Sequence, residues 1–344
     1  MYLESCGHLN SQHFESAKKV PALFLSRIIP EFQVDAMTST SMIPLAVLLL
    51  VVLQQVIRVD VALVTVGVRV TDSRGRDVTG LKAKDFSVFE DGYPRDIAFF
   101  SNEAQPITLG ILADRSSSMA YGNKLERSKD AARALVGGAR EGSEFFYIEF
   151  DEGVNVASDF TDKRAEVISA IGRTALGGGT SLYDAIIKGL ALTDRAQRSR
   201  RALIVISDGT DQHSRYGLQQ TVRLIRESEI QIFTIGYFSR EEEELFRSAK
   251  AKVMRIDGKE LDNPRVALEK IAEESGAAFF FPRSDKELTQ AVREISEDLR
   301  TQYTIAFYPR EQSRANPYHE LRVTVRENSY KVRARPGYGT RTVE

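Results

Sequence analysis

Polar side chains follow apolar runs at three places in the sequence. The run ITLGILA leads directly into Asp114, and Ser116 and Ser118 follow at alternate positions. The run RALIVIS leads into Asp208, and a glycine triplet leads into Thr180. The carboxyl ends of strands in an open α/β sheet form a common edge where ligands bind. We therefore expect these five side chains to converge.

Three hydroxyls and two carboxylates, with no histidine or cysteine, are ligands for a hard cation. The set suits Mg²⁺, Mn²⁺ or Ca²⁺ rather than zinc. Neutral hydroxyls that bind the ion directly leave it electron-poor, so an open coordination position would favour an external anionic oxygen. The residue types predict a divalent-metal site that takes its last ligand from outside the chain.

Each segment has an ordinary structural explanation when it is taken alone. The pattern D-x-S-x-S is typical of a turn or a helix cap, GGGT of a flexible loop, and Ser-Asp-Gly of a turn. Their order in the chain and the elements around them indicate that the three segments form one site. A predicted strand precedes Asp114, a predicted helix follows Thr180, and another predicted strand precedes Asp208.

The elements that must position these residues alternate between strand and helix over residues 107–300. Buried-strand runs such as RALIVIS and IQIFTIG are typical of a parallel sheet covered on both faces, and apolar residues recur at helical spacing between them. This alternation predicts an α/β fold with a doubly wound, mostly parallel sheet. We expect helices over 124–136, 182–190, 218–228, 266–275 and 288–299.

Segments typical of β-strands flank this unit on both sides. RVDVALVTVGVRV precedes it, and FSVFEDGYPRDIAFF is interpreted as two strands around Asp91–Gly92. After it come QYTIAFY and a predicted hairpin around Glu327–Ser329. Two or three strands alone are only marginally stable. We therefore expect the two flanks to form one small β-sandwich into which the α/β domain is inserted. The predicted divisions are 1–55 (leader), 56–105 and 301–344 (sandwich halves) and 106–300 (α/β domain).

The leader contains an uncharged apolar run, IPLAVLLLVVL, at residues 43–53. Eleven residues are too few to cross a bilayer comfortably but fit the apolar core of a signal peptide. Met37 and Met42 are alternative starts, in which case the positive flank usual for such signals is missing. The run predicts an exported protein, whether secreted, periplasmic or membrane-anchored; a buried core segment is the alternative.

Composition excludes several classes of protein. The 344 residues carry 47 Lys and Arg against 48 Asp and Glu, for a net charge of −1, so no global field attracts nucleic acid. One cysteine, Cys6, excludes an internal disulfide framework and a thiolate zinc cluster, and four histidines argue against a His-rich metal site. The sequence contains neither a nucleotide-binding G-x-x-x-x-G-K-[ST] nor a hydrolase G-x-S-x-G motif.

The segments ILADRSSSM, LGGGTSLYDAI and LIVISDGTD resemble the metal-ion-dependent adhesion site of von Willebrand factor type A domains. The flanks are similar to those of bacterial exported "VWFA-related" proteins, and that match spans nearly the whole chain after residue 56. The resemblance implies a von Willebrand A-like fold in a protein that is not generally an enzyme. It implies binding of a protein partner through a divalent ion, usually Mg²⁺, completed by a partner Asp or Glu. The implied metal ligands are Asp114, Ser116, Ser118, Thr180 and Asp208.

The sequence departs from this family pattern at three places. Ser117 stands where glycine is usual, which predicts a tighter or reshaped loop. Arg115 places a cation beside the site, which would weaken metal binding or help to hold an acidic partner. The segment 274–277, Glu-Ser-Gly-Ala, replaces a common Thr-Gly-Gly, and we interpret this difference as structural.

Other polar residues near these motifs have competing interpretations. His213 is expected to be a solvent-facing turn residue rather than a ligand contact. Asp184 and Asp211 are expected to serve a helix N-terminus, the alternative being that they orient waters of the site. The acidic run 241–244 predicts a solvated helix start, and 240–262 a mobile insertion or a partner-selecting loop.

Three functions are consistent with the sequence. The favoured one is an exported, metal-dependent protein-binding module. A metal-assisted hydrolase using the same oxygen cluster would need a general base, for which His213 is the candidate. A structural envelope protein with a vestigial site is the third.

Overall fold

The computed structural model describes most of the chain beyond the leader. The described residues are 63–248, 253–256, 259–310 and 317–340. The predicted leader 1–55, with its apolar run 43–53, lies outside them. In the described part, no helix is both long enough and apolar enough to span a membrane.

The central sheet has six strands in the order β12-β9-β8-β5-β6-β7. Only β7 is antiparallel to its neighbour. Every residue of β5 is buried, as expected for a strand covered on both faces. The strands are β5 (Ile107–Asp114), β6 (Glu144–Phe150), β7 (Val154–Thr161), β8 (Arg200–Ser207), β9 (Gln231–Gly236) and β12 (Phe279–Phe280). The predicted α/β fold with a mostly parallel sheet is confirmed.

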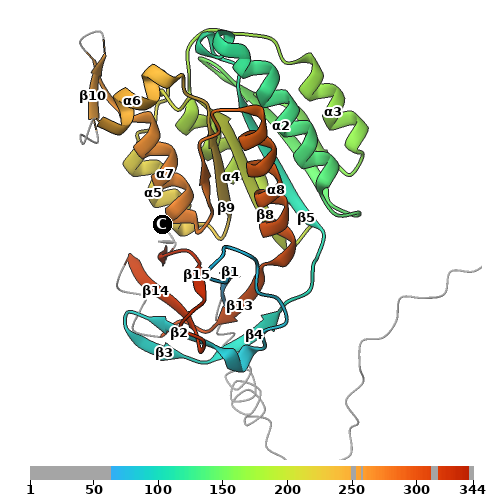
Figure 1. Ribbon diagram of the computed structural model, residues 1–344, viewed down its shortest axis with the longest axis vertical. Coiled ribbons are helices and arrows are strands. Elements are labelled where there is room, and N and C mark those ends of the chain that lie inside the picture. Colours follow the sequence, from blue (N-terminus) through green and yellow to red (C-terminus); the bar gives the residue numbers. More distant parts are fainter. Residues whose placement is uncertain (1–62, 249–252, 257–258, 311–316, 341–344) are drawn as a thin grey trace, which may run out of the picture. The chain divides into compact units, whose positions relative to one another are not determined.

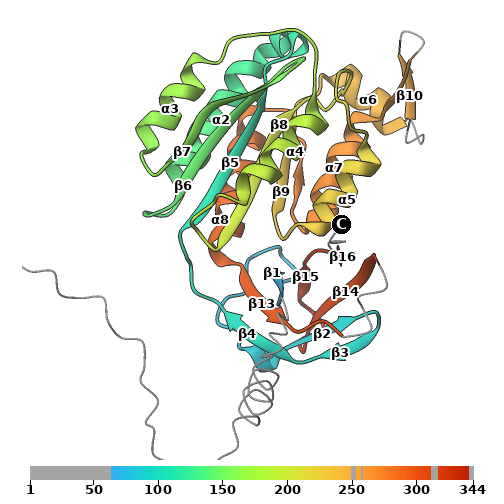
Figure 2. The ribbon, with the colours of Figure 1, turned by 180° about the vertical axis from the view of Figure 1, so that it is seen from behind.

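Helices cover both faces of this sheet and bury a separate apolar cluster on each. One cluster contains side chains of α2, α3 and α8, and the other those of α4, α5 and α7. The two groups lie on opposite sides of the strands (Figures 1 and 2). Their bounds are α2 (Lys124–Gly138), α3 (Arg164–Arg173), α4 (Leu182–Thr193), α5 (Leu218–Glu227), α7 (Pro264–Ser275) and α8 (Asp285–Thr301).

The flanking segments form two four-stranded sheets, β15-β1-β13-β4 and β16-β14-β2-β3. Each contains strands from both sides of the α/β unit, and alternate residues of both sheets share one core. One sheet has β1 (Val64–Thr71), β4 (Ile97–Ser101), β13 (Tyr303–Phe307) and β15 (Lys331–Arg333). The other has β2 (Phe86–Glu90), β3 (Tyr93–Arg95), β14 (Tyr318–Val325) and β16 (Gly337–Gly339). A short 3-10 helix, η1 (Ala83–Asp85), precedes β2. The predicted insertion into a β-sandwich is confirmed.

The structure differs from the expected strands of the flanks at two places, in the pairing at the first and in the number of strands at the second, where the pair around Asp91–Gly92 is confirmed. The strands on either side of Glu327–Ser329 do not form a hairpin: β14 pairs with β2 and β16, whereas β15 pairs with β1. The chain between them crosses from one sheet to the other, because each strand buries its apolar side chains against the opposite sheet. Similarly, FSVFEDGYPRDIAFF forms three strands, of which β2 and β3 pair around Asp91 while β4 joins the other sheet.

The segment 240–262 contains regular structure, contrary to the expectation of a mobile insertion. It forms α6 (Arg240–Ser248) and the antiparallel strands β10 (Val253–Ile256) and β11 (Lys259–Asp262). The acidic start of α6 is also more than a solvated surface. Glu243 is buried and pairs with Arg283, and Glu242 pairs with Lys124.

An ion pair joins α8 to the flanking strands. The Asp298 carboxylate is buried and pairs with Arg333 of β15, and Arg69 of β1 lies 3.9 Å from the same oxygen. Burial lowers the pKa of Arg333 to about 10, and the neighbouring charge of Arg69 adds to the effect. Asp298 is therefore the ion-pair partner of Arg333 at the point where α8 leads into β13, whereas Arg69 has Asp77 as its nearer partner at 2.6 Å.

Asp298→Ala is expected to destabilise the protein by about 3 kcal/mol, because it leaves buried guanidinium charge without its partner. Urea denaturation measures this loss. Asp130→Ala is the matched control, since Asp130 pairs with Arg133 on an exposed face of α2 and should cost less than about 1 kcal/mol. Equal losses in the two variants would contradict the prediction.

Candidate metal centre

Asp114 ends the central strand β5 and is completely buried. The parallel pairing of Ala113 with Ile206 places Asp114 beside the end of β8. Its Oδ2 accepts a hydrogen bond of 2.5 Å from the Ser207 hydroxyl, and its Oδ1 accepts one of 2.8 Å from the Ser116 amide. The carboxylate therefore connects two adjacent strand ends.

The two predicted serine ligands lie side by side after this strand. Their hydroxyl oxygens are 2.9 Å apart. Ser116 is buried and precedes η2 (Ser117–Asn123), a 3-10 segment in which Ser118 is half-buried. The alternate spacing of the motif thus brings both hydroxyls to one point.

Backbone hydrogen bonds join the glycine loop to the serine loop. The Ser117 amide donates to the Gly178 carbonyl, and the Gly177 amide donates to the Arg115 carbonyl, both at 2.7 Å. This ladder holds the two loops against each other. Thr180, which follows directly, is buried.

The third loop is hydrogen-bonded to Thr180. The amides of Gln212 and His213 both donate to the Thr180 carbonyl at 3.0 Å. The His213 ring is exposed, and its Nδ1 lies 3.4 Å from the Thr180 amide. His213 therefore supports the loop, and all three predicted segments meet around Thr180.

The glycine triplet 177–179 is required by close packing rather than by flexibility. A Cβ atom at the three positions would lie 2.1 Å from Asp151 Oδ2, 2.5 Å from Glu152 Oε1 and 2.1 Å from His213 Cε1. Any side chain there would push the loop away from its neighbours. The absence of side chains lets the loop that carries Thr180 approach the others.

Asp208 follows β8 and is buried. Within the described chain, neither of its carboxylate oxygens accepts a hydrogen bond. The Lys124 ammonium is 3.5 Å from its Oδ2. A buried carboxylate without hydrogen bonds is costly unless a cation compensates it.

The electrostatics of the two carboxylates favour a bound cation. Burial raises the pKa of Asp114 to about 7, and the nearby charge of Asp208 adds to this effect. Burial also raises the pKa of Asp208, against the opposing influence of the Lys124 charge. Two carboxylates that each oppose ionisation of the other are stabilised together by a divalent ion.

The five predicted ligands therefore fit a divalent ion in their chemistry. The structure brings their three loops together, and the buried Asp208 carboxylate has the Lys124 ammonium and the Ser118 hydroxyl as its polar neighbours. Among the described residues, no group of three or more His, Cys, Asp or Glu forms a metal site of its own. Metal binding by the five residues stays a prediction.

The departures from the family pattern have simple structural outcomes. Arg115 is not a free cation: its guanidinium pairs with Asp151 at 2.7 Å and donates to the Ala175 carbonyl. Outside glycine, the described residues with positive φ are Asp91 and Asn123, so Ser117 needs no glycine-like backbone. Arg115 is therefore paired within the loop, and Ser117 lies there without a left-handed backbone.

Asp184 and Asp211 connect the start of α4 to the loop after Asp208. Asp211 accepts hydrogen bonds from the Tyr183 amide and the Ser214 hydroxyl, and Asp184 accepts two from Arg215. Asp184 lies in the first turn of α4, and Asp211 lies against that turn. Negative charge is favourable at a helix N-terminus.

Two charged residues beside the site were missed by the sequence analysis. Lys124 begins α2 and reaches Asp208, while Glu242 reaches Lys124 from α6 with an Oε2–Nζ distance of 3.2 Å. A lysine and a glutamate at helix starts are usually solvated, and no local pattern indicates that they meet. They are considered further below.

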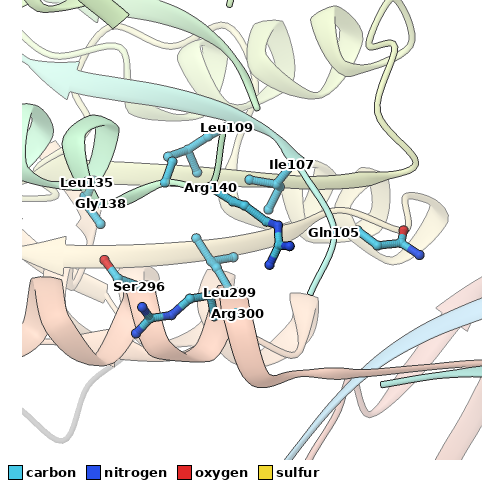
Figure 3. Close-up of a pocket in the computed structure, with 10 residues that line it drawn as sticks. Gln105, Ile107, Leu109, Leu135, Gly138, Arg140, Ser296, Leu299 and Arg300 are labelled. Atoms are coloured by element: carbon cyan, nitrogen blue, oxygen red, sulfur yellow. The ribbon is translucent and has the colours of Figure 1, made fainter. Parts of the chain in front are cut away.

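A small cavity of about 20 Å³ lies elsewhere, between the end of α2 and α8. Figure 3 shows Leu109 and Ile107 of β5 facing Leu299 and Ser296 of α8 across it. The cavity has room for about one water molecule. It lies at the amino end of β5, away from Asp114, and is therefore not part of the candidate metal centre.

This fold and the arrangement of its loops agree with the result of comparison with known families. Residues 109–298 match the von Willebrand factor type A domain. The chain belongs to this family, whose members are commonly metal-dependent adhesion or interaction modules. An uncharacterized protein of Borreliella burgdorferi is 24% identical over 190 residues, which cover 54% of this chain and 55% of that relative. The chain thus spans about half the length of this curated relative.

Solved structures of type A domains are similar to the chain at low identity. A von Willebrand factor type A protein from Catenulispora acidiphila is 13% identical with a TM-score of 0.46, over 74% of each chain. The vWF domain of the type V pili tip protein Mfa5 from Porphyromonas gingivalis is 14% identical with a TM-score of 0.44, over 56% of this chain and 95% of its own. Proximal thread matrix protein 1 from the mussel byssus, with a zinc-occupied MIDAS motif, is 15% identical with a TM-score of 0.44, over 61% and 49%.

Proposed function

We propose that this protein is an exported, divalent-metal-dependent protein-binding module. The observation that supports it best is the pair of buried carboxylates, Asp114 and Asp208, at one edge of the sheet, whose burial raises the pKa of both, together with the hydroxyls on the neighbouring loops. Asp114, Ser116, Ser118, Thr180 and Asp208 would hold the ion. Mg²⁺ is the expected occupant, with Mn²⁺ or Ca²⁺ as alternatives.

The ion would supply a Lewis-acidic position for an outside carboxylate, and the chain would supply the rest of the binding surface. Hydroxyls contribute no negative charge, so only two carboxylates of the site oppose the approach of an anionic partner. A protein that presents Asp or Glu is therefore the expected ligand.

Exposed apolar side chains on the same loops suit a protein partner. Tyr121 lies in η2, Leu176 immediately precedes the glycine triplet, and Tyr216 follows the Asp208 loop; all three are exposed. Large apolar side chains in the interaction region contribute most of the binding energy in many interfaces. We expect them to contact the residues that flank the partner carboxylate.

Export is proposed from the sequence. The uncharged run 43–53 has the length of a signal-peptide core. One cysteine, Cys6, precedes this run, so the rest of the chain needs no disulfide for its stability. Whether the leader is cleaved or anchors the protein in a membrane decides between secretion and attachment.

The arrangement offers little support for a hydrolase. His213, the candidate general base, is exposed, and its Nδ1 faces the Thr180 amide. Turnover of phosphoesters that Ser116→Ala abolishes would favour catalysis over binding.

The proposed function predicts that partner capture depends on the metal. A pull-down from an envelope extract should retain a partner in Mg²⁺ and lose it in EDTA, because the ion supplies the partner's ligand position. Asp208→Ala should lose the same partner even in Mg²⁺. A partner retained in EDTA and by the variant would contradict the proposal.

A further inference from the structure

Lys124 is a buried lysine at an electrostatically unfavourable place. It is the first residue of α2, where the helix dipole disfavours a positive charge, and its side chain is only 8% exposed. Its ammonium lies between two carboxylates, 3.5 Å from Asp208 Oδ2 and 3.2 Å from Glu242 Oε2. These two carboxylates hold the charge in place.

Glu242 is itself fixed by the start of α6. Its Oε2 accepts a hydrogen bond of 2.6 Å from the Ser239 amide, and the Ser239 hydroxyl accepts one of 3.1 Å from the Glu242 amide. This reciprocal arrangement is a capping box. Because α6 follows β9, the neighbour of β8, Glu242 meets Lys124 at the same edge of the sheet as Asp208.

We propose that Lys124 is a tethered cation that competes with the divalent ion for Asp208, and that Glu242 sets the strength of this competition. The inference rests on the proposed metal site. An ammonium beside Asp208 compensates the buried carboxylate in the metal-free protein and repels an incoming divalent ion. Metal binding requires the ammonium to move toward Glu242, so the first turn of α6 helps to determine the metal affinity.

The competition predicts opposite effects for the two partners of the ion pair. Lys124→Met removes the competitor and should tighten Mg²⁺ binding about tenfold or more, because a nearby like charge is lost. Glu242→Gln deprives the ammonium of its alternative partner and should weaken binding about threefold to tenfold. Glutamine preserves the capping box. A merely structural role of the pair would instead weaken binding in both variants.

Calorimetric titration of the EDTA-stripped full chain with Mg²⁺, and separately with Mn²⁺, tests this. Lys129→Met is the matched control, because Lys129 is a second buried lysine of α2 that pairs with Glu126 and should leave the affinity unchanged. The Glu242 charge also acts directly on Asp208. If it works mainly through the ammonium, Glu242→Gln should weaken binding less in the Lys124→Met background than in the wild type.

The outcomes separate this inference from the proposed function. Tighter binding by Lys124→Met with weaker binding by Glu242→Gln supports the competition. Metal binding that is unchanged or weaker in Lys124→Met, or unchanged or tighter in Glu242→Gln, overturns it while the metal site stands. If Lys124→Met does not fold, Lys124→Gln replaces it, because glutamine removes the same charge but keeps a hydrogen-bond donor near Asp208, and tighter binding remains the expected result. Absence of metal binding in the wild-type chain and in every variant overturns the proposed function itself.

Discussion

Asp208→Asn should weaken Mg²⁺ binding by about 100-fold or more in calorimetric titration. Loss of even an outer hydrogen-bond partner of a metal ligand costs about 10- to 100-fold, and this change removes the charge of a proposed ligand. Asparagine has nearly the same shape as aspartate, so the packing around position 208 is retained. The substitution also weakens the interaction of Asp208 with the Lys124 ammonium, which lies 3.5 Å from its Oδ2, so urea denaturation of the variant should accompany the titration.

Asp211→Asn is the matched control for this prediction. Asp211 belongs to the same Ser-Asp-Gly-Thr-Asp segment, but its carboxylate accepts hydrogen bonds from the Tyr183 amide and the Ser214 hydroxyl. The control variant should bind Mg²⁺ within about threefold of the wild type, because these hydrogen bonds of Asp211 go to the start of α4 and to Ser214 and to none of the proposed ligands. Wild-type affinity in Asp208→Asn, or an equal loss in both variants, would show that Asp208 is not a ligand.

The arrangement of the candidate site follows from features that the sequence displays directly. ITLGILA and RALIVIS are mostly apolar because their strands are covered on both faces, so their ends are easily recognised. Asp114 and Asp208 stand at those ends, and parallel neighbours in a sheet share an edge. Local pattern and topology together were therefore enough to predict that these loops meet.

Lys124 and Glu242 could not be found in the same way. The position of Lys124 in the sequence indicates only an ordinary polar residue at the start of a helix. Its burial depends on Asp208, 84 positions later, and on Glu242, 118 positions later. Such a contact depends on how α2 and α6 approach the ends of the sheet, which no periodicity encodes.

The flanking segments show a different limit to what can be predicted from the sequence. Alternation of apolar residues correctly indicates strands, because one side of each strand faces the shared core. It does not indicate which sheet a strand joins, since both sheets present the same apolar face. The strands on either side of Glu327–Ser329 were therefore assigned to one hairpin, although they belong to opposite sheets.

Gly276→Ala should destabilise the protein by about 3 kcal/mol or more, although position 276 is remote from the metal site. Gly276 ends α7 in the left-handed region, with φ of 79°, where a side chain is strained. A Cβ atom there would also lie 2.4 Å from the Arg335 amide nitrogen and 2.9 Å from the Ala334 carbonyl carbon. These are backbone atoms of the flanking segment, so no side-chain rotation relieves the clash.

Gly137→Ala tests whether the loss of stability in Gly276→Ala comes from the contact of position 276 with the flanking segment. Gly137 is an exposed residue of α2, and a Cβ atom at this position would have no neighbouring atom within 4 Å outside its own helix turn among the described residues. Alanine there should stabilise the helix by about 0.5 to 1 kcal/mol.

Urea denaturation of Gly276→Ala and Gly137→Ala measures the difference in their free energies of unfolding. A loss below about 1 kcal/mol in Gly276→Ala would mean that the end of α7 and the segment between β15 and β16 can separate at little cost. The expected larger loss would show that the close approach of the inserted domain and its sandwich requires glycine at this position, where the family often has Thr-Gly-Gly.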